Sequence, residues 1–240
     1  MSHTVRVPIL MYHKIERLNK ASTVKGHYVS PNLFKKHLSL LKLMGYTAIP
    51  LSSLYRENAK LPKKPVVITF DDGYVNFLQN ALPALKSVGY SATVYLVANQ
   101  LGGTNAWDTS RGDVEERLMS VDQVLEAHRQ GTEFGSHTLD HADLAAVSTD
   151  EAWKQIADSK SKLEADLGFP IETFCYPYGR KNLDVQKMVE QAGYRLACST
   201  ERGQNTAQTD RFALKRINVR RDTWAPVLAL KLLRGDKHDV

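Results

Sequence analysis

The alternation of two kinds of segment along the 240-residue chain is the strongest constraint on its fold. Short apolar runs rich in β-branched and aromatic residues alternate with longer segments whose apolar residues recur at helical spacing. This alternation is typical of repeated β-α units around a parallel sheet. The predicted strands are residues 7–12, 46–49, 66–70, 92–97, 133–136, 173–176, 195–199 and 212–219. The predicted helices are residues 31–44, 75–88, 120–130, 149–167, 183–192 and 224–233.

A glycine followed by a tyrosine marks the return from helix to sheet at three places. These steps are Gly45-Tyr46, Gly89-Tyr90 and Gly193-Tyr194, each directly after a predicted helix. Such regular returns favour an α/β barrel over an open sheet. The chain has 42% hydrophobic residues and no Pro/Gly/Ser-rich linker. We therefore expect residues 1–240 to form a single domain.

Composition argues against several classes of partner. Lysine and arginine exceed acidic residues by 32 to 26, but the basic residues are scattered apart from a late cluster, so we expect no nucleic-acid partner. The two cysteines, Cys175 and Cys198, lie in apolar strand-like runs and are expected to be buried free thiols. No run is long and apolar enough for a membrane span, and no signal peptide is recognised. The expected location is cytoplasmic, with an exported form that has lost its signal left open; the oligomeric state is unknown.

The first chemical signal is a pair of aspartates at the end of a predicted strand. The run from Val66 to Phe70 leads directly into Asp71, Asp72 and Gly73. Adjacent side chains at a strand end point in different directions, so one carboxylate can bind a metal while its neighbour addresses a water on that metal. A capping aspartate in an Asp-Gly turn is the alternative interpretation of this motif taken alone.

A pair of histidines after another strand gives the second signal. His137 and His141 are four residues apart, so on a helical turn they share one face and can bind one divalent ion. Two histidines and one carboxylate leave coordination positions open, as in catalytic zinc sites. Lone histidines are more often satisfied core or surface residues, but the presence of Asp71-Asp72 favours a metal site.

At these motifs the sequence resembles the polysaccharide deacetylases, which share the NodB-homology domain and form carbohydrate esterase family four. The resemblance extends from Val7 to about Trp224, and its start resembles the permuted poly-N-acetylglucosamine deacetylases. Three runs carry it: Thr69-Phe70-Asp71-Asp72-Gly73, Ser136-His137-Thr138-Leu139-Asp140-His141 and Phe174-Cys175-Tyr176-Pro177-Tyr178-Gly179.

The resemblance implies a distorted barrel of seven or eight β/α units and hydrolysis of the acetamide of an N-acetylated sugar. It implies a divalent metal, usually zinc with cobalt, nickel or manganese as alternatives, held by Asp72, His137 and His141. Asp71 would act as the base on the metal-bound water. The backbone amide of Tyr178 would bind the substrate and help to stabilise the oxyanion.

Two departures from the family pattern lead to further hypotheses. Many members begin the third motif with an arginine that orients the base, whereas this chain has Cys175 there. Arg216 on the predicted strand 212–219 could replace it, because guanidinium is a bidentate carboxylate partner. The C-terminal segment offers only His238 as a general acid, so His13 at the end of the first strand is the better candidate. A satisfied strand-end histidine is the alternative for His13.

The substrate is expected to be an acetylated poly- or oligosaccharide. Trp107 and Trp224 are candidates for stacking on the sugar, although Trp224 could equally belong to the core. Two other functions remain open at this point: a non-catalytic carbohydrate-binding barrel and another metal-dependent hydrolase such as a phosphoesterase.

Overall fold

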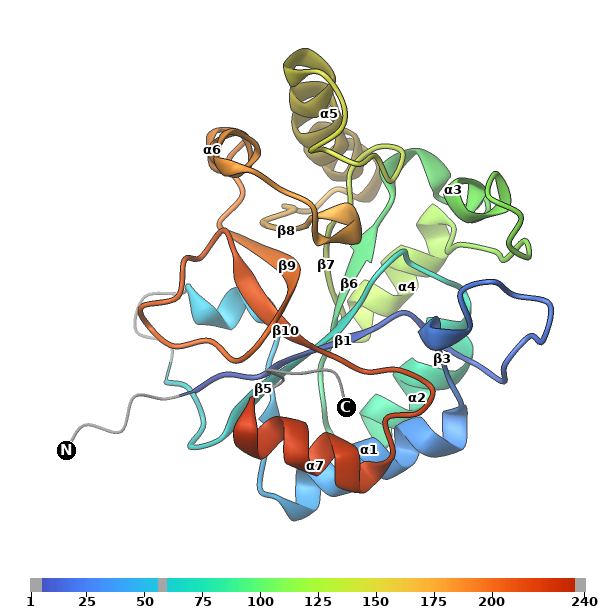
Figure 1. Ribbon diagram of the computed structural model, residues 1–240, viewed down its shortest axis with the longest axis vertical. Coiled ribbons are helices and arrows are strands. Elements are labelled where there is room, and N and C mark those ends of the chain that lie inside the picture. The colour runs from blue at the N-terminus through green and yellow to red at the C-terminus, as the bar shows by residue number, and fades with distance from the viewer. Residues whose placement is uncertain (1–5, 56–59, 236–240) are drawn as a thin grey trace.

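The apolar runs of the sequence form a closed parallel barrel. The structure, a computed structural model, describes residues 6–55 and 60–235. Seven strands follow one another around the barrel, and pairing of the last with the first closes it (Figure 1). In spatial order they are β1 (Ile9–Tyr12), β10 (Leu214–Asn218), β9 (Leu196–Arg202), β8 (Thr173–Cys175), β7 (Glu133–Ser136), β6 (Thr93–Leu96) and β5 (Pro65–Phe70). The predicted barrel is confirmed.

One of the eight predicted strands, residues 46–49, forms but does not enter the ring. This strand, β4 (Thr47–Ala48), pairs with Pro65 and Val66 at the start of β5. From Val67 onward β5 pairs directly with β1. A separate small parallel sheet joins β2 (Lys14–Ile15) to β3 (Tyr28–Val29) beyond the end of β1.

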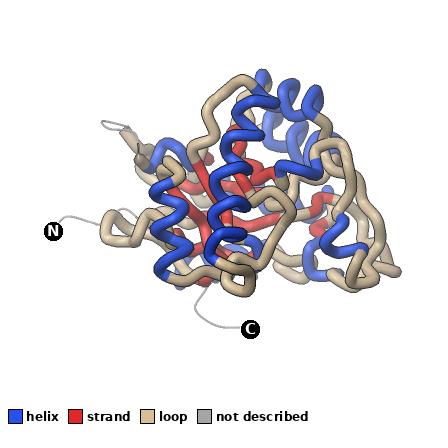
Figure 2. Tube along the Cα trace, turned by 90° about the horizontal axis from the view of Figure 1, so that it is seen from above, coloured by secondary structure: helices blue, strands red, loops and turns tan. Residues whose placement is uncertain are grey.

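Helices cover the outside of the barrel, as Figure 2 shows with strands inside and helices around them. The α-helices are α1 (Pro31–Leu43), α2 (Leu82–Ser87), α3 (Ala106–Thr109), α4 (Val121–Arg129), α5 (Thr149–Leu167), α6 (Leu183–Gln191) and α7 (Ala225–Arg234). The short helical turns are η1 (Lys25–His27), η2 (Leu51–Leu54), η3 (Phe77–Ala81), η4 (Ala98–Gln100) and η5 (Pro177–Gly179). No helix in the described part of the chain is long and apolar enough to cross a membrane.

One helix prediction was wrong in detail. Residues 75–88 do not form one α-helix, because the segment starts with the π-helical turn η3 and continues as α2. Pro83 in the first turn of α2 has no N–H to donate to the preceding turn, and its ring crowds that turn. The wider π-helical turn ahead of it accommodates this.

Alternate side chains of the strands belong to two separate clusters. Leu10 and Ile68 pack in the large cluster that contains the helix residue Phe34. Ile9 and Val67 belong to a smaller cluster that includes Tyr95. Since successive strand side chains point to opposite faces, the smaller cluster fills the barrel interior. It forms a solid floor beneath the polar groups at the carboxyl ends of the strands.

Candidate active site

A small polar cavity of about 180 Å³ lies at the carboxyl ends of the strands. In parallel barrels the loops at this end share one face, so groups from distant parts of the chain can meet there. Seven of the nine residues predicted for the site line this cavity. The complete lining is Met11, His13, His27, Asp71, Asp72, Trp107, Asp108, His137, His141, Tyr178, Thr200 and Asn218.

The structure brings the three predicted metal ligands together. The Oδ1 atom of Asp72 lies 3.6 Å from Nε2 of His137 and 3.4 Å from Nε2 of His141. This oxygen is buried and has no hydrogen-bond partner among the described residues. Asp72 and His141 both have left-handed backbone conformations, with φ of 76° and 61°, which aim their side chains inward from tight turns. A buried anionic oxygen that faces two imidazole nitrogens fits a divalent cation.

Hydrogen bonds on the far side of both imidazoles support this assignment. His137 Nδ1 lies 2.7 Å from the carbonyl oxygen of Cys175, which can only accept, so Nδ1 carries the proton. His141 Nδ1 lies 3.0 Å from the hydroxyl of Tyr178. Burial lowers the pKa of each histidine to about 4. Both rings are therefore neutral at pH 7, with Nε2 free to bind a metal.

Asp71, His137 and Cys175 form a second compact group of possible ligands. Burial raises the pKa of the Cys175 thiol well above its ordinary value, so the sulfur stays protonated. The Asp71 carboxylate is already bound by a guanidinium. The Asp72 group is therefore the better metal site.

Arg216 binds Asp71 in a bidentate ion pair inside the barrel. Its Nη1 and Nη2 atoms donate to the two carboxylate oxygens of Asp71 at 2.7 and 2.8 Å. Burial alone would raise the pKa of Asp71, but the positive charge of Arg216 outweighs this and holds that pKa well below its ordinary value. Asp71 is thus ionised and fixed in direction.

Cys175 leaves space for this arginine. Arg216 Nη2 donates to the sulfur of Cys175 at 3.1 Å, and Nε donates to the carbonyl oxygen of Ser199 at 2.8 Å. A long side chain at position 175 would point into the same buried space. Arg216 on β10 supplies to Asp71 the guanidinium that an arginine at position 175 would otherwise provide.

His13 lies beside the base and stacks on a second histidine. Its Nε2 is 3.9 Å from Oδ2 of Asp71, and its ring centroid is 3.9 Å from that of His27 at an interplanar angle of 13°. In the small sheet, Lys14 is in register with Tyr28, so the preceding residues of the two strands are neighbours. Burial, followed by the charge of His27, lowers the pKa of His13, whereas Asp71 raises it.

The predicted aromatic residues differ in position. Trp107 stacks on the ring of His141 at 4.5 Å between centroids and lines the cavity. Trp224 is 59% exposed at the start of α7 and is not among the residues that line the cavity. The structure therefore excludes a core position for Trp224 and does not bring it to the site. His238 lies outside the described residues.

Sequence reasoning missed several residues of the cavity. Asn218 at the end of β10 and Thr200 on β9 follow the rule that polar groups at strand ends face the site, which could have identified them. His27 had no usable signal, because it precedes a strand of only two residues.

The chain is similar in sequence to known polysaccharide deacetylases. Residues 58–197, more than half of the chain, match the family model described as polysaccharide deacetylase. The Staphylococcus epidermidis poly-β-1,6-N-acetyl-D-glucosamine N-deacetylase is 28% identical over 237 residues, covering 94% of this chain and 80% of that protein.

Solved structures show the same barrel. The Streptococcus pyogenes deacetylase PplD in complex with acetate superposes with a TM-score of 0.82 at 29% identity, covering 96% of this chain and 99% of that one. A polysaccharide deacetylase from Bacillus cereus gives a TM-score of 0.80 at 27% identity, covering 95% and 69%. The barrel and its site define a carbohydrate deacetylase. The chain belongs to the polysaccharide deacetylase family.

Proposed function

We propose that this protein removes acetyl groups from the N-acetylglucosamine residues of a β-1,6-linked polysaccharide, with a zinc ion held by Asp72, His137 and His141. The observation that carries the proposal is the buried Oδ1 of Asp72, which faces two imidazole nitrogens and has no donor among the described residues. The name of the staphylococcal relative supports the choice of sugar and linkage.

The donor set favours zinc among the divalent ions. Two imidazole nitrogens and one carboxylate are the ligands of many catalytic zinc sites, which keep a position open for water and substrate. Cobalt, nickel and manganese accept similar donors and remain possible substitutes. A divalent ion bound here supplies an acidified water and polarises the acetyl carbonyl.

Asp71 and His13 divide the proton transfers between them. Asp71, ionised and oriented by Arg216, accepts the proton of the attacking water. His13 stands next to it, and its protonated form donates a proton to the nitrogen of the leaving sugar amine through Nε2. Because burial lowers the pKa of His13, this form is a minor one in the resting protein and a strong acid. Since Nε2 of His13 and Oδ2 of Asp71 are 3.9 Å apart, both can address one tetrahedral centre.

Tyr178 and Trp107 complete the binding of the acetyl group. Tyr178 has a left-handed backbone with φ of 58°, which fixes the tight turn of η5 at the cavity wall. Its hydroxyl contacts His141, and its backbone amide is proposed to donate to the developing oxyanion. Trp107 stacks on one face of the His141 ring and lines the cavity, where it can contact the sugar.

The test is release of acetate from chemically defined β-1,6-linked N-acetylglucosamine oligomers. Metal-free protein should be inactive, and stoichiometric zinc should restore acetate release together with an equal amount of free amine. Asp122→Asn on the exposed side of α4 serves as a matched control and should behave like the parent protein. If the oligomers bind but no acetate appears with any divalent ion, the protein is a binding module and the proposal is wrong. Equal or faster release from β-1,4-linked oligomers would overturn the choice of linkage.

A further inference from the structure

The loop at residues 102–119, which we call the covering loop, forms one wall of the active-site cavity. It contains the short helix α3, and Trp107 of this helix stacks on the ring of His141. Further along the loop, the guanidinium of Arg111 lies over the ring of Tyr178, 5.1 Å from its centre. The covering loop therefore contacts both a proposed metal ligand and the turn η5.

The backbone holds the C-terminal end of the covering loop but not the part that contacts the site. The N–H of Met119 donates to the carbonyl oxygen of Gly73 at 2.9 Å, and the N–H of Val75 donates to that of Arg117 at 3.0 Å. In the described chain, the backbone hydrogen bonds of residues 106–111 stay within the loop. Side-chain contacts must therefore hold this part against the site.

Lys14 is a fully buried cation between the first strand and the covering loop. It directly follows His13 in the chain and is 0% exposed. Its Nζ lies 3.3 Å from Oε1 of Glu116 and 3.9 Å from Oδ2 of Asp113, and both carboxylates belong to the covering loop. One cation therefore joins the segment that carries the proposed general acid to the loop that carries Trp107.

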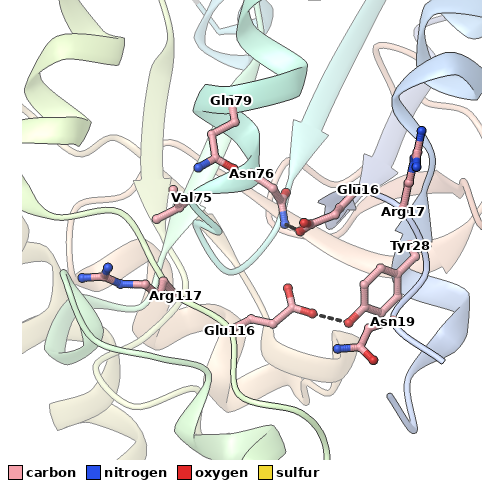
Figure 3. A pocket seen from close by; sticks show the side chains of 9 residues that line it. All are labelled: Glu16, Arg17, Asn19, Tyr28, Val75, Asn76, Gln79, Glu116 and Arg117. Atoms are coloured by element: carbon pink, nitrogen blue, oxygen red, sulfur yellow. Dashed lines mark hydrogen bonds between the residues drawn. The ribbon is translucent and has the colours of Figure 1, made fainter. Parts of the chain in front are cut away.

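Two tyrosines enclose the ammonium group of Lys14. Its Nζ lies 4.7 Å from the ring centre of Tyr28 and 4.6 Å from that of Tyr74, within the range of cation–π attraction. The hydroxyl of Tyr28 donates a hydrogen bond to Glu116, as Figure 3 shows. The cation, the rings and the carboxylate form one network, in which electrostatic attraction is strong because little water enters.

The charges of this network are balanced across the contact between strand and loop. Asp113 Oδ1 accepts a hydrogen bond from the backbone N–H of Thr23 at 2.6 Å, whereas its buried Oδ2 has no hydrogen-bond partner among the described residues and faces Lys14. Removing one partner of a buried ion pair leaves the other charge unpaired and drives it toward water. Loss of the Lys14 charge should therefore release the covering loop.

We propose that Lys14 is a positioning residue that holds the covering loop in place, so that Trp107 stays stacked on His141 and the substrate cavity keeps its wall. The effect on catalysis rests on the proposed function, but the position of the loop can be measured without it. Lys14 does not line the cavity and acts through the loop. If the loop is in place for only a fraction of the time, the apparent affinity for substrate falls by that fraction, so KM should change more than kcat.

The first measurement follows Trp107 directly, by quenching of its fluorescence with acrylamide. The chain has three tryptophans, so Trp153→Phe with Trp224→Phe leaves Trp107 as the single emitter. Both replaced residues are exposed, and neither lines the cavity. In this background we expect Lys14→Met to raise the quenching constant of Trp107 toward that of a free tryptophan derivative, because the ring leaves the His141 face.

The second measurement is the steady-state rate of acetate release at saturating zinc. We expect Lys14→Met to raise KM about tenfold, the rise that follows if the loop is in place for a tenth of the time, with a smaller change in kcat. Lys160→Met is the matched control, because Lys160 on α5 also pairs with a carboxylate, that of Glu164, and lies 5.3 Å from the ring centre of Tyr194. The control should change neither KM nor the quenching of Trp107.

The outcomes separate this proposal from the proposed function. Unchanged quenching in folded Lys14→Met would refute the proposal, even if acetate release is never observed. A fall in kcat with unchanged KM and quenching would also overturn it, because Lys14 would then act on His13 and not through the loop. No acetate from the parent protein with any divalent ion would refute the proposed function alone, and quenching would still decide the role of Lys14.

A second variant covers the case in which Lys14→Met does not fold. Glu116→Gln removes the negative charge but can still accept the hydrogen bond from Tyr28. It should raise KM and the quenching constant in the same direction by a smaller factor. No rise in either quantity would refute the proposal.

Discussion

Asp71 and Asp72 are neighbours in the chain, equally buried, and have opposite surroundings. Each is 3% exposed. Asp71 receives two hydrogen bonds from Arg216, and its pKa lies below the ordinary value despite burial. Asp72 has a buried oxygen without a donor in the described chain, and burial raises its pKa.

This difference fits the two tasks proposed for the dipeptide. A carboxylate that the protein's own cation already neutralises cannot gain much from a metal, but it is held ready as a base. A carboxylate that the fold leaves without a cation is costly unless one is supplied from outside. Asp72 has a left-handed backbone, and its side chain faces His137 and His141, whereas that of Asp71 faces Arg216. The predictions below test this division of roles, from the largest expected effect to the smallest.

Among the changes around Asp71, Arg216→Met should have the largest effect, and it should lower both the stability of the fold and turnover. It leaves a buried, unpaired carboxylate, which costs about 3–5 kcal/mol of unfolding free energy. We expect turnover to fall by roughly 10²-fold or more, because the base loses its orientation, while zinc remains bound. Urea unfolding, acetate release and metal content measure the three quantities. The double variant with Asp71→Asn should recover much of the stability but none of the activity; recovery of activity would contradict the role of Arg216.

His13→Ala should lower turnover by about 10²-fold with full metal content, because general acid catalysis contributes at least this much. The matched control is His128→Ala, whose ring stacks on Phe169 away from the site. A substrate with a better leaving group, such as an N-acetylated aromatic amine, should be affected less. Unchanged turnover with the sugar substrate would show that His13 is a satisfied strand-end residue.

Tyr178→Phe should weaken zinc binding or turnover by about tenfold. The change removes the hydroxyl that orients His141 through Nδ1, and losing a group of this kind typically costs 10- to 100-fold. Competitive chelator titration gives the affinity. Tyr90→Phe, which removes a hydroxyl bonded to the Tyr46 carbonyl away from the site, is the control. Equal effects of both changes would argue against a specific role for Tyr178.

The pH dependence of metal binding should be weak. Histidines of ordinary pKa, near 6.5, would lose up to about tenfold in metal affinity per histidine for each pH unit below that value. Burial lowers the pKa of His137 and His141 to about 4, so protons should not compete with the metal at these rings until the pH falls toward 4. Calorimetry from pH 7.5 to 5.5 should therefore show less than tenfold change attributable to the histidines. A steep loss below pH 6.5 would mean that the rings are more solvated than the structure shows.

Much of the fold follows from the sequence because its signals are local. Each of the eight apolar runs forms a strand where predicted, and Asp71, His137 and Tyr178 follow strand ends, where the barrel requires its polar groups to meet. The cysteine at position 175, where the family pattern has an arginine, also predicts that another cation approaches Asp71. The structure brings Arg216 there.

Other features depend on contacts that local patterns do not encode. His27 reaches the site only because a sheet of two-residue strands sets it beside His13. The π-helical turn η3 depends on how the segment accommodates Pro83. Trp224 is a type of side chain that can stack on sugars, but it lies exposed at the start of α7 and does not line the cavity. The residue type alone does not tell where the folded chain places the ring.

The most direct test of the account is metal binding by Asp71→Asn and Asp72→Asn measured side by side. We predict that Asp71→Asn binds one zinc ion with nearly the affinity of the parent protein, yet releases acetate at least about 10²-fold more slowly. Asp72→Asn should lose both stoichiometric zinc and acetate release. Loss of zinc in Asp71→Asn, or full zinc binding in Asp72→Asn, would contradict the assignment of the two carboxylates.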